Sequence, residues 1–199
     1  MSAPRIYLAS ASPRRTELLD TLGIAHHVLR VPSPPGEDEP RHAGESPQAY
    51  VCRTAREKAH RGNEWIRSRG LPPLPILTAD TCVSMDDLVL GKPEDENDAA
   101  RILATLSGAC HQVRTAVVLW SDDRIIEALS TTDVWMRPLD HDEIARYCAS
   151  GEPFGKAGAY GIQGYAGAFV SRLEGSYTGV MGLPLYETAQ LLVEAGVSV

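Results

Sequence analysis

The sequence predicts an α/β to α+β fold in which helices flank a mixed β-sheet. Short apolar segments of strand character are interspersed with amphipathic helical segments along the 199 residues. Two pairs of predicted strands are joined by tight turns, so part of the sheet is expected to be antiparallel. The composition, 43% hydrophobic and 23% charged, fits a globular protein with a real core, and we expect one domain over residues 1–199.

The chain opens with a predicted strand and a helix. Residues 5–9 are apolar with one aromatic side chain, which is typical of a buried strand. Ser12 and Pro13 indicate a helix start, with serine as the N-cap and proline at the first helical position. Apolar residues at helical spacing continue this helix, and Gly23 ends it.

A longer helix is predicted over residues 47 to about 67, between Pro-rich loops at 32–40 and 70–75. Ser46 is its expected N-cap. Its apolar face consists of Tyr50, Val51, Ala55 and Ala59.

Beyond residue 75 the pattern predicts further strands and helices. The expected strands cover residues 76–83, 88–90, 113–120 and 125–136, with hairpin turns at 86–87 and 121–123. The expected helices cover residues 95–106, 140–149 and 183–194.

Composition and spacing exclude several classes of protein. The net charge of −7 argues against a protein that coats nucleic acid. The four cysteines and six histidines have no metal-binding spacing, and no nucleophile elbow or Walker loop occurs. The chain shows no signal peptide and no bilayer-spanning stretch, so we expect a cytoplasmic protein with neither nucleic acid nor membrane as a partner.

Two arginines in the first turn of the first predicted helix are unusual. Arg14 and Arg15 have the wrong sign for the helix dipole, which favours carboxylates at that end. A bound phosphate would resolve the conflict, because helix N–H groups and two guanidinium groups would converge on it. The alternative is two solvated arginines at a small energetic cost.

Carboxylates occur at two informative places. Asp80 follows an apolar strand, where a carboxylate is expensive to bury unless it is paired, protonated or bound to metal. The alternative is an aspartate that hydrogen-bonds neighbouring backbone. Glu37, Asp38 and Glu39 lie in a Pro-rich loop, where one of them could bind Mg²⁺ or all could be solvated.

Two residues lie in turns that suit ligand contact. Lys92 lies between Gly91 and Pro93, and a lysine in a rigid turn loses little entropy on meeting a phosphate. Gln163 lies near glycines, and its amide can donate and accept in the pattern that the imide edge of uracil or thymine requires. The alternative for Gln163 is a turn residue that faces water.

Several short motifs follow one another in a fixed order. They are LASASPRRTELL (8–19), REKA (56–59), TADT (78–81), GKP (91–93), LSG (106–108), HQVRT (111–115), KAGAYGIQG (156–164), GSY (175–177) and GLPL (182–185). Each is weak alone, but together they resemble the Maf-like nucleoside triphosphate pyrophosphatases nearly end to end.

The resemblance implies a fold and an activity. The fold would be an elongated mixed sheet surrounded by helices, with two lobes and a central cleft between them. The usual assembly would be a homodimer. The activity would be hydrolysis of dTTP and UTP to the monophosphate and pyrophosphate, through metal-assisted attack of water on the α-phosphorus. The cofactor would be a divalent cation, Mg²⁺, Mn²⁺ or Co²⁺.

The resemblance also implies roles for individual residues. Asp80 would be the general base and a metal ligand, with Glu39 as the second ligand. The substrate-binding residues would be Ser10, Arg14, Arg15, Lys58, Lys92 and Lys156, and the specificity residues Arg14, Thr81 and Gln163. The chain departs from the family pattern in its proline spacing around Glu39 and in Gly155, where many members have aspartate.

Two alternatives stay open. One is the same chemistry on 7-methyl-GTP, which a second branch of the family performs. The other is a nucleotide-binding regulator of septum formation without catalysis. Asp80 discriminates between binding and catalysis, because a pure anion binder gains nothing from a carboxylate near the phosphates unless a metal is there.

Overall fold

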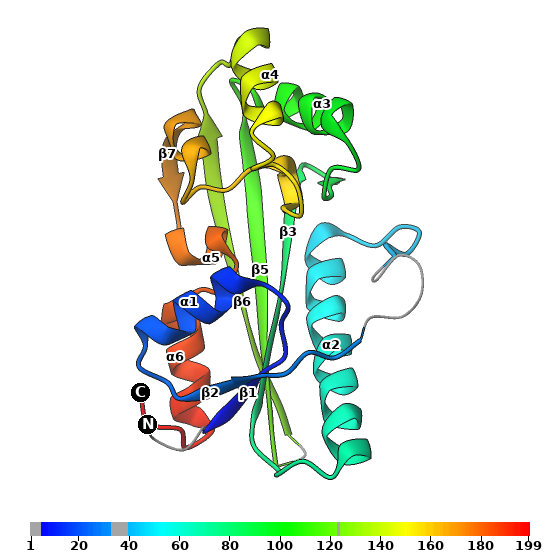
Figure 1. Ribbon diagram of the computed structural model, residues 1–199, viewed down its shortest axis with the longest axis vertical. Coiled ribbons are helices and arrows are strands. Elements are labelled where there is room, and N and C mark those ends of the chain that lie inside the picture. Colours follow the sequence, from blue (N-terminus) through cyan, green and yellow to red (C-terminus); the bar gives the residue numbers. More distant parts are fainter. Residues whose placement is uncertain (1–4, 33–39, 123) are drawn as a thin grey trace.

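The structure, a computed structural model, describes residues 5–32, 40–122 and 124–199. These residues form a seven-stranded mixed sheet in the order β2-β1-β3-β5-β6-β7, with β4 paired to β3 (Figure 1). The strands are β1 (Ile6–Leu8), β2 (His26–Val28), β3 (Ile76–Met85), β4 (Leu88–Leu90), β5 (Cys110–Ser121), β6 (Arg124–Met136) and β7 (Val170–Glu174). The β1–β2 and β1–β3 pairs are parallel and the others antiparallel, which confirms the predicted mixed sheet.

Helices surround this sheet, as the sequence predicts. They are α1 (Pro13–Thr21), α2 (Pro47–Arg69), α3 (Glu96–Leu106), α4 (His141–Ala149), α5 (Tyr177–Met181) and α6 (Leu185–Glu194), with 3₁₀ turns η1 (Ala157–Ala159) and η2 (Tyr165–Phe169). Within the described ranges, no helix has both the length and the apolar character needed to cross a membrane.

Local capping explains where the long helices begin. The Ser46 side chain accepts a hydrogen bond from the backbone N–H of Ala49, and Asp95 caps α3 in the same way. Asp140 and Glu143 form a reciprocal capping box at α4. Ser12 occupies the N-cap position of α1, as predicted, but its side chain accepts no capping hydrogen bond. Pro13 is the first residue of the helix.

The long strands β3, β5 and β6 form the spine of the molecule and run along most of its longest axis (Figure 1). Helix α2 packs beside β3 and β5, where Val51, Ala55 and Ala59 join one apolar cluster. Helices α1 and α6 pack on a second cluster that contains Leu77 and Val117.

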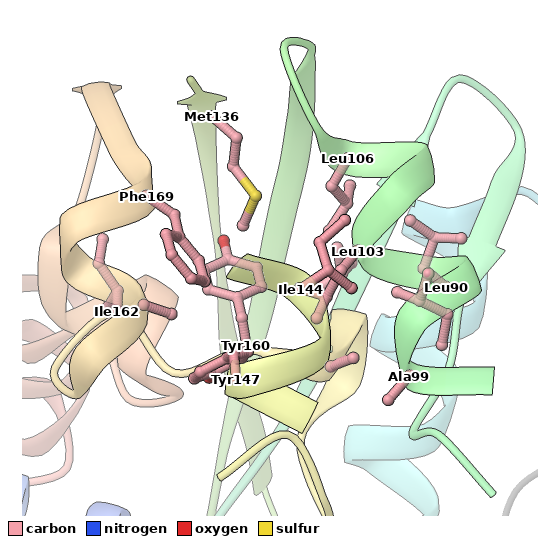
Figure 2. Packing of buried hydrophobic residues seen from close by; sticks show 14 of the residues in the cluster. Leu90, Ala99, Leu103, Leu106, Met136, Ile144, Tyr147, Tyr160, Ile162 and Phe169 are labelled. Carbon is pink, nitrogen blue, oxygen red and sulfur yellow. The ribbon is translucent and has the colours of Figure 1, made fainter. Parts of the chain in front are cut away.

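A third apolar cluster lies at the end of the spine that α3 and α4 cover. Figure 2 shows Leu103 and Leu106 of α3, Ile144 and Tyr147 of α4, and Phe169 of η2 converging there. The sheet therefore carries separate cores towards its two ends, while the division into two lobes stays a prediction.

Among the strands and α-helices of the described residues, β2, β7 and α5 were not predicted from the sequence, and neither were the 3₁₀ turns η1 and η2. Strand β2 is only three residues long, and two of those are histidines. Strand β7 has mostly exposed or half-buried residues, so it lacks a hydrophobic period. Helix α6 begins two residues later than predicted, because Pro184 is its N-cap.

The turn η1 is held against the sheet by a glycine. The N–H of Gly158 donates to the carbonyl of Gly91 over 3.0 Å, which links η1 to the residues after β4. Gly158 has a φ of +73°, and a Cβ atom there would lie 2.8 Å from Cγ1 of Val83, a buried β3 residue. Both the backbone conformation and the close packing require glycine.

We expect Gly158→Ala to lower the free energy of unfolding by about 2 to 4 kcal/mol, from a left-handed backbone and overpacking together. Gly151→Ala is the matched control, because Gly151 has a φ of +76° but no atom within 4 Å of its Cβ position. It should lose only the backbone part, about 1 to 2 kcal/mol. Urea unfolding measures both; equal losses in the two variants would contradict the packing argument.

Candidate active site

The predicted site residues come together around one cavity of about 620 Å³. The cavity is lined by the β1–α1 connection, α2, β3, the turn after β4, residues 155–163 and the end of α5. The predicted residues that line it are Ser10, Arg14, Arg15, Lys58, Asp80, Thr81, Lys92, Lys156 and Gln163. Glu39, the predicted second metal ligand, lies outside the described residues, as do Glu37 and Asp38.

The cavity is strongly cationic, although the chain as a whole has a net charge of −7. Among its described lining residues, Asp80 is the single carboxylate. The cations are Arg14, Arg15, Arg30, Lys58, Arg61, Lys92 and Lys156. Such a concentration of positive charge favours a polyanionic ligand.

Asp80 lies on the central strand β3 and is 8% exposed. Its Oδ1 accepts from Nζ of Lys58 at 2.6 Å, and its Oδ2 accepts from the hydroxyl of Thr54 at 2.7 Å. Both donors come from α2. This carboxylate is therefore paired, as its burial requires, and it still contacts the cavity.

Thr81 faces the other side of β3, because successive strand residues point to opposite faces. Its hydroxyl lies 3.0 Å from that of Thr115, which in turn donates to the carbonyl of Gly179 at 2.7 Å. Nη2 of Arg15 donates to Thr81 Oγ1 at 3.2 Å. These contacts connect β3 and β5 to α1 and α5 at the edge of the cavity.

The two arginines of α1 have different environments. Nε of Arg15 donates to the carbonyl of Gly182 at 2.8 Å, so Arg15 ties α1 to the end of α5. Its Nη1 also lies 3.4 Å from the hydroxyl of Ser10, which accepts from the N–H of Ser12. Arg14 makes no such hydrogen bond to the described part of the chain, and its guanidinium is available for a ligand.

Arg14 and Lys156 approach each other from distant parts of the sequence. Burial lowers the pKa of Lys156, the positive charge of Arg14 lowers it further, and Glu152 opposes both effects. Nζ of Lys156 also donates to the backbone carbonyl of Glu152. Two cations that repel across a cavity would both be stabilised by an anion between them.

Gln163 lies at the exposed rim of the cavity, close to Lys156. A Cβ atom on Gly161 would lie 3.0 Å from Cε of Lys156 and 3.3 Å from Nε2 of Gln163. Because Gly161 has no side chain, the side chains of Lys156 and Gln163 can both pass close to its Cα atom. The short connection places a cation and an amide side by side at one edge of the cavity.

Beneath this segment is a buried pair that the sequence did not single out. Nε2 of His111 lies 2.8 Å from the hydroxyl of Tyr160, which lines the cavity. His111 is 2% exposed, and burial lowers its pKa to about 4. Its Nδ1 has no hydrogen-bond partner among the described residues. The neutral imidazole therefore anchors the 155–163 segment to β5.

Three other residues at the site were also missed. Arg61 lines the cavity one turn after Lys58, so helical spacing could have found it. Arg30 follows β2, a strand too short and polar to predict. Thr54 contacts Asp80 only through the packing of α2 on β3, for which the sequence carries no local signal.

The donor set is compatible with a divalent cation of the Mg²⁺ type. Such ions take one or two carboxylates and complete their coordination with substrate phosphates and water. Asp80 supplies one carboxylate with unused lone pairs. The described ranges contain no group of three or more His, Cys, Asp or Glu side chains placed so that they could hold a metal ion.

Comparisons of the sequence with known proteins find relatives that cover nearly the whole chain. A family model described as Maf-like protein matches residues 5–195. A relative from Bordetella parapertussis is 64% identical over 196 residues, covering 98% of this chain and 95% of its own. A relative from Chromobacterium violaceum is 53% identical, covering 96% and 95%. Both relatives are named dTTP/UTP pyrophosphatase.

The buried His111 predicts a specific loss of stability in acid. Its pKa is about 4 in the folded protein and about 6.5 in an unfolded chain, so the unfolded state binds more protons between these values. The neutral His111 side chain therefore does not lower the free energy of unfolding above about pH 6.5. As the pH falls towards 4, this free energy decreases by up to about 3 kcal/mol.

Urea unfolding of wild type and His111→Gln between pH 7 and 4 measures this effect. The wild-type curve should fall more steeply, because glutamine does not titrate. His141→Gln is the control, since the His141 side chain is 97% exposed. Parallel curves for wild type and His111→Gln would show that the imidazole does not carry the effect.

Proposed function

The chain belongs to the Maf-like protein family, and we propose on this premise that it hydrolyses dTTP and UTP to the monophosphate and pyrophosphate. The observation that carries the proposal is a single described carboxylate, Asp80, in a cavity lined by lysine and arginine side chains. Cations bind a triphosphate, and a carboxylate beside them can accept a proton. A site for anion binding alone has no use for that carboxylate.

The cations bind the triphosphate and stabilise its transition state. Negative charge builds up on the leaving pyrophosphate as the bond between the α-phosphorus and the bridging oxygen breaks. Fixed cations in a partly enclosed cavity stabilise that charge more than water does. Arg14, Lys92 and Lys156 reach the cavity from three separate segments, so they can contact different phosphates.

Asp80 is the proposed general base. It takes a proton from the attacking water while the water oxygen bonds to the α-phosphorus. Lys58 and Thr54 each use one lone pair of its two oxygens, so each oxygen keeps another for water or a cation. The contact with Lys58 also holds the carboxylate in place at the cavity.

Asp80 is also the proposed ligand for a divalent cation, with Glu39 as the second ligand. When bound, Mg²⁺, Mn²⁺ or Co²⁺ would neutralise phosphate charge and make the phosphorus more electrophilic. The lysines and arginines of the cavity perform the rest of the charge neutralisation.

The pyrimidine is proposed to bind at the Gln163 edge. The amide of Gln163 can donate to one carbonyl of the base and accept from the imide N–H. Thr81 and Arg14 complete the proposed specificity set. Val83, Val113 and Met181 also line the cavity and give it apolar surface against which a ring can pack.

Three expectations stay predictions, of which only the first rests on the family resemblance. They are a homodimer, a cytoplasmic location and a single domain over residues 1–199.

We expect Asp80→Asn to lower kcat for UTP by about 10²- to 10⁴-fold, because the amide cannot accept the proton. Nucleotide binding should be largely kept, since the cations remain. Pyrophosphate release with Mg²⁺, Mn²⁺ and Co²⁺ measures kcat, and Asp142→Asn, on an 85% exposed side chain, is the control. Near wild-type turnover in folded Asp80→Asn protein would exclude Asp80 as the base.

Gln163→Ala should reduce discrimination rather than chemistry. We expect kcat/KM for UTP and dTTP to fall by about 10- to 100-fold, because the base loses its hydrogen-bond partner. CTP and 7-methyl-GTP should change little, and Gln190→Ala on the exposed face of α6 is the control. Equal losses on all four nucleotides would assign Gln163 to the phosphates or the fold, and a wild-type preference for 7-methyl-GTP would place the chain in the other branch.

A further inference from the structure

Thr54 is a fully buried residue of α2 that lies directly behind the carboxylate of Asp80. Its hydroxyl has three acceptors within reach: Oδ2 of Asp80 at 2.7 Å, the carbonyl of Tyr50 at 3.0 Å and the carbonyl of Val51 at 3.1 Å. A hydroxyl has one proton, so only one of these acceptors can receive it.

The carboxylate is the acceptor that the chemistry favours. Hydrogen bonds to a charged acceptor are shorter and stronger, and the contact with Asp80 is the shortest of the three. The two carbonyls lie within a continuous helix, where backbone N–H groups already serve them. A Thr hydroxyl commonly bonds back to its own helix, and here a better acceptor competes with that bond.

Thr54 and Lys58 hold the two oxygens of Asp80 from the same side. They are four residues apart, so they lie on one face of α2. Lys58 donates to Oδ1 and Thr54 to Oδ2. A carboxylate bonded at both oxygens cannot turn about its Cβ–Cγ bond, and its remaining lone pairs are fixed in direction.

We infer that Thr54 is a positioning residue: it fixes the rotation of the Asp80 carboxylate so that the unused lone pairs face the cavity. Thr54 is 0% exposed and does not line the cavity, so it acts on the reaction only through Asp80. The inference rests on the proposed function, since it assigns Thr54 to the reaction in which Asp80 is the base.

Three variants separate positioning from packing. Thr54→Val keeps the shape and removes the hydroxyl, whereas Thr54→Ser keeps the hydroxyl and removes the methyl group. Thr78→Val is the matched control, because Thr78 is also fully buried on β3 and donates to the carbonyl of Ala55 in α2 at 2.9 Å. It loses a hydroxyl at the same helix–strand junction without touching Asp80.

The expected result is a loss of turnover specific to Thr54→Val. Its kcat for UTP should fall by about 10- to 100-fold, the usual effect of removing a partner of a metal-binding carboxylate, with little change in KM. Thr54→Ser should keep most of the wild-type kcat. Thr78→Val should keep all of it, while its thermal midpoint falls about as far as that of Thr54→Val.

A second measurement tests the metal-binding capacity of the Asp80 carboxylate and does not require turnover. Mn²⁺ binding is followed by electron paramagnetic resonance in the presence of α,β-methylene UTP, which cannot be hydrolysed at the α–β position. Thr54→Val should weaken Mn²⁺ binding, and Thr54→Ser and Thr78→Val should not. If wild type hydrolyses no nucleotide, the proposed function fails, and this measurement alone decides the role of Thr54.

Three outcomes would overturn the inference. In the first, Thr54→Val has wild-type kcat and wild-type Mn²⁺ binding. In the second, Thr54→Ser loses as much as Thr54→Val, which would assign the effect to the methyl group. In the third, Thr78→Val loses as much as Thr54→Val, which would assign it to the packing of α2 on β3.

Discussion

The structure depends on the requirement that a carboxylate buried in a central strand must be paired. Asp80 meets it through Thr54 and Lys58, so α2 must lie close to β3 at this position. Small residues of α2 permit that approach. A Cβ atom on Gly62 would already lie 3.3 Å from Cγ2 of Ile76, and Ala55 accepts a hydrogen bond from Thr78 across the same junction.

The alternation of side chains along β3 then distributes the site between two faces of the sheet. Asp80 faces α2, and Thr81 faces α1 and the end of α5. One strand thereby brings the proposed base and a proposed specificity residue into one cavity through neighbouring positions. The arginine that reaches Thr81 is held by a carbonyl 167 residues away, so the two ends of the chain must both fold before the cavity exists.

The sequence predicted those parts of the fold that depend on interactions between residues close together in the chain. The capped helices and the long strands are correct because Ser46, Asp95 and Asp140 act within one helical turn and the apolar periods are long. The edge strands β2 and β7 lack such a period, since their residues are largely exposed.

The candidate site likewise contains residues that the sequence predicted and contacts that it could not predict. Short motifs identified many of the residues that line the cavity, although not Arg30 or Arg61, and they did not reveal the environment of any of them. Arg14 and Arg15 are neighbouring residues of the same type, and only the fold gives Arg15 its contacts with Gly182 and Thr81. Thr54 and the His111–Tyr160 pair could not be predicted, because each contact joins segments that only the completed fold brings together.

The charge of the cavity also has a kinetic consequence. Attraction by the cations speeds the capture of a polyanionic nucleotide, and dissolved salt weakens that attraction. Pyrophosphate, the product of the proposed reaction, is itself a polyanion, and the same cations would attract it. In the proposed reaction, salt therefore slows capture and speeds release, so we expect turnover to be greatest at an intermediate ionic strength.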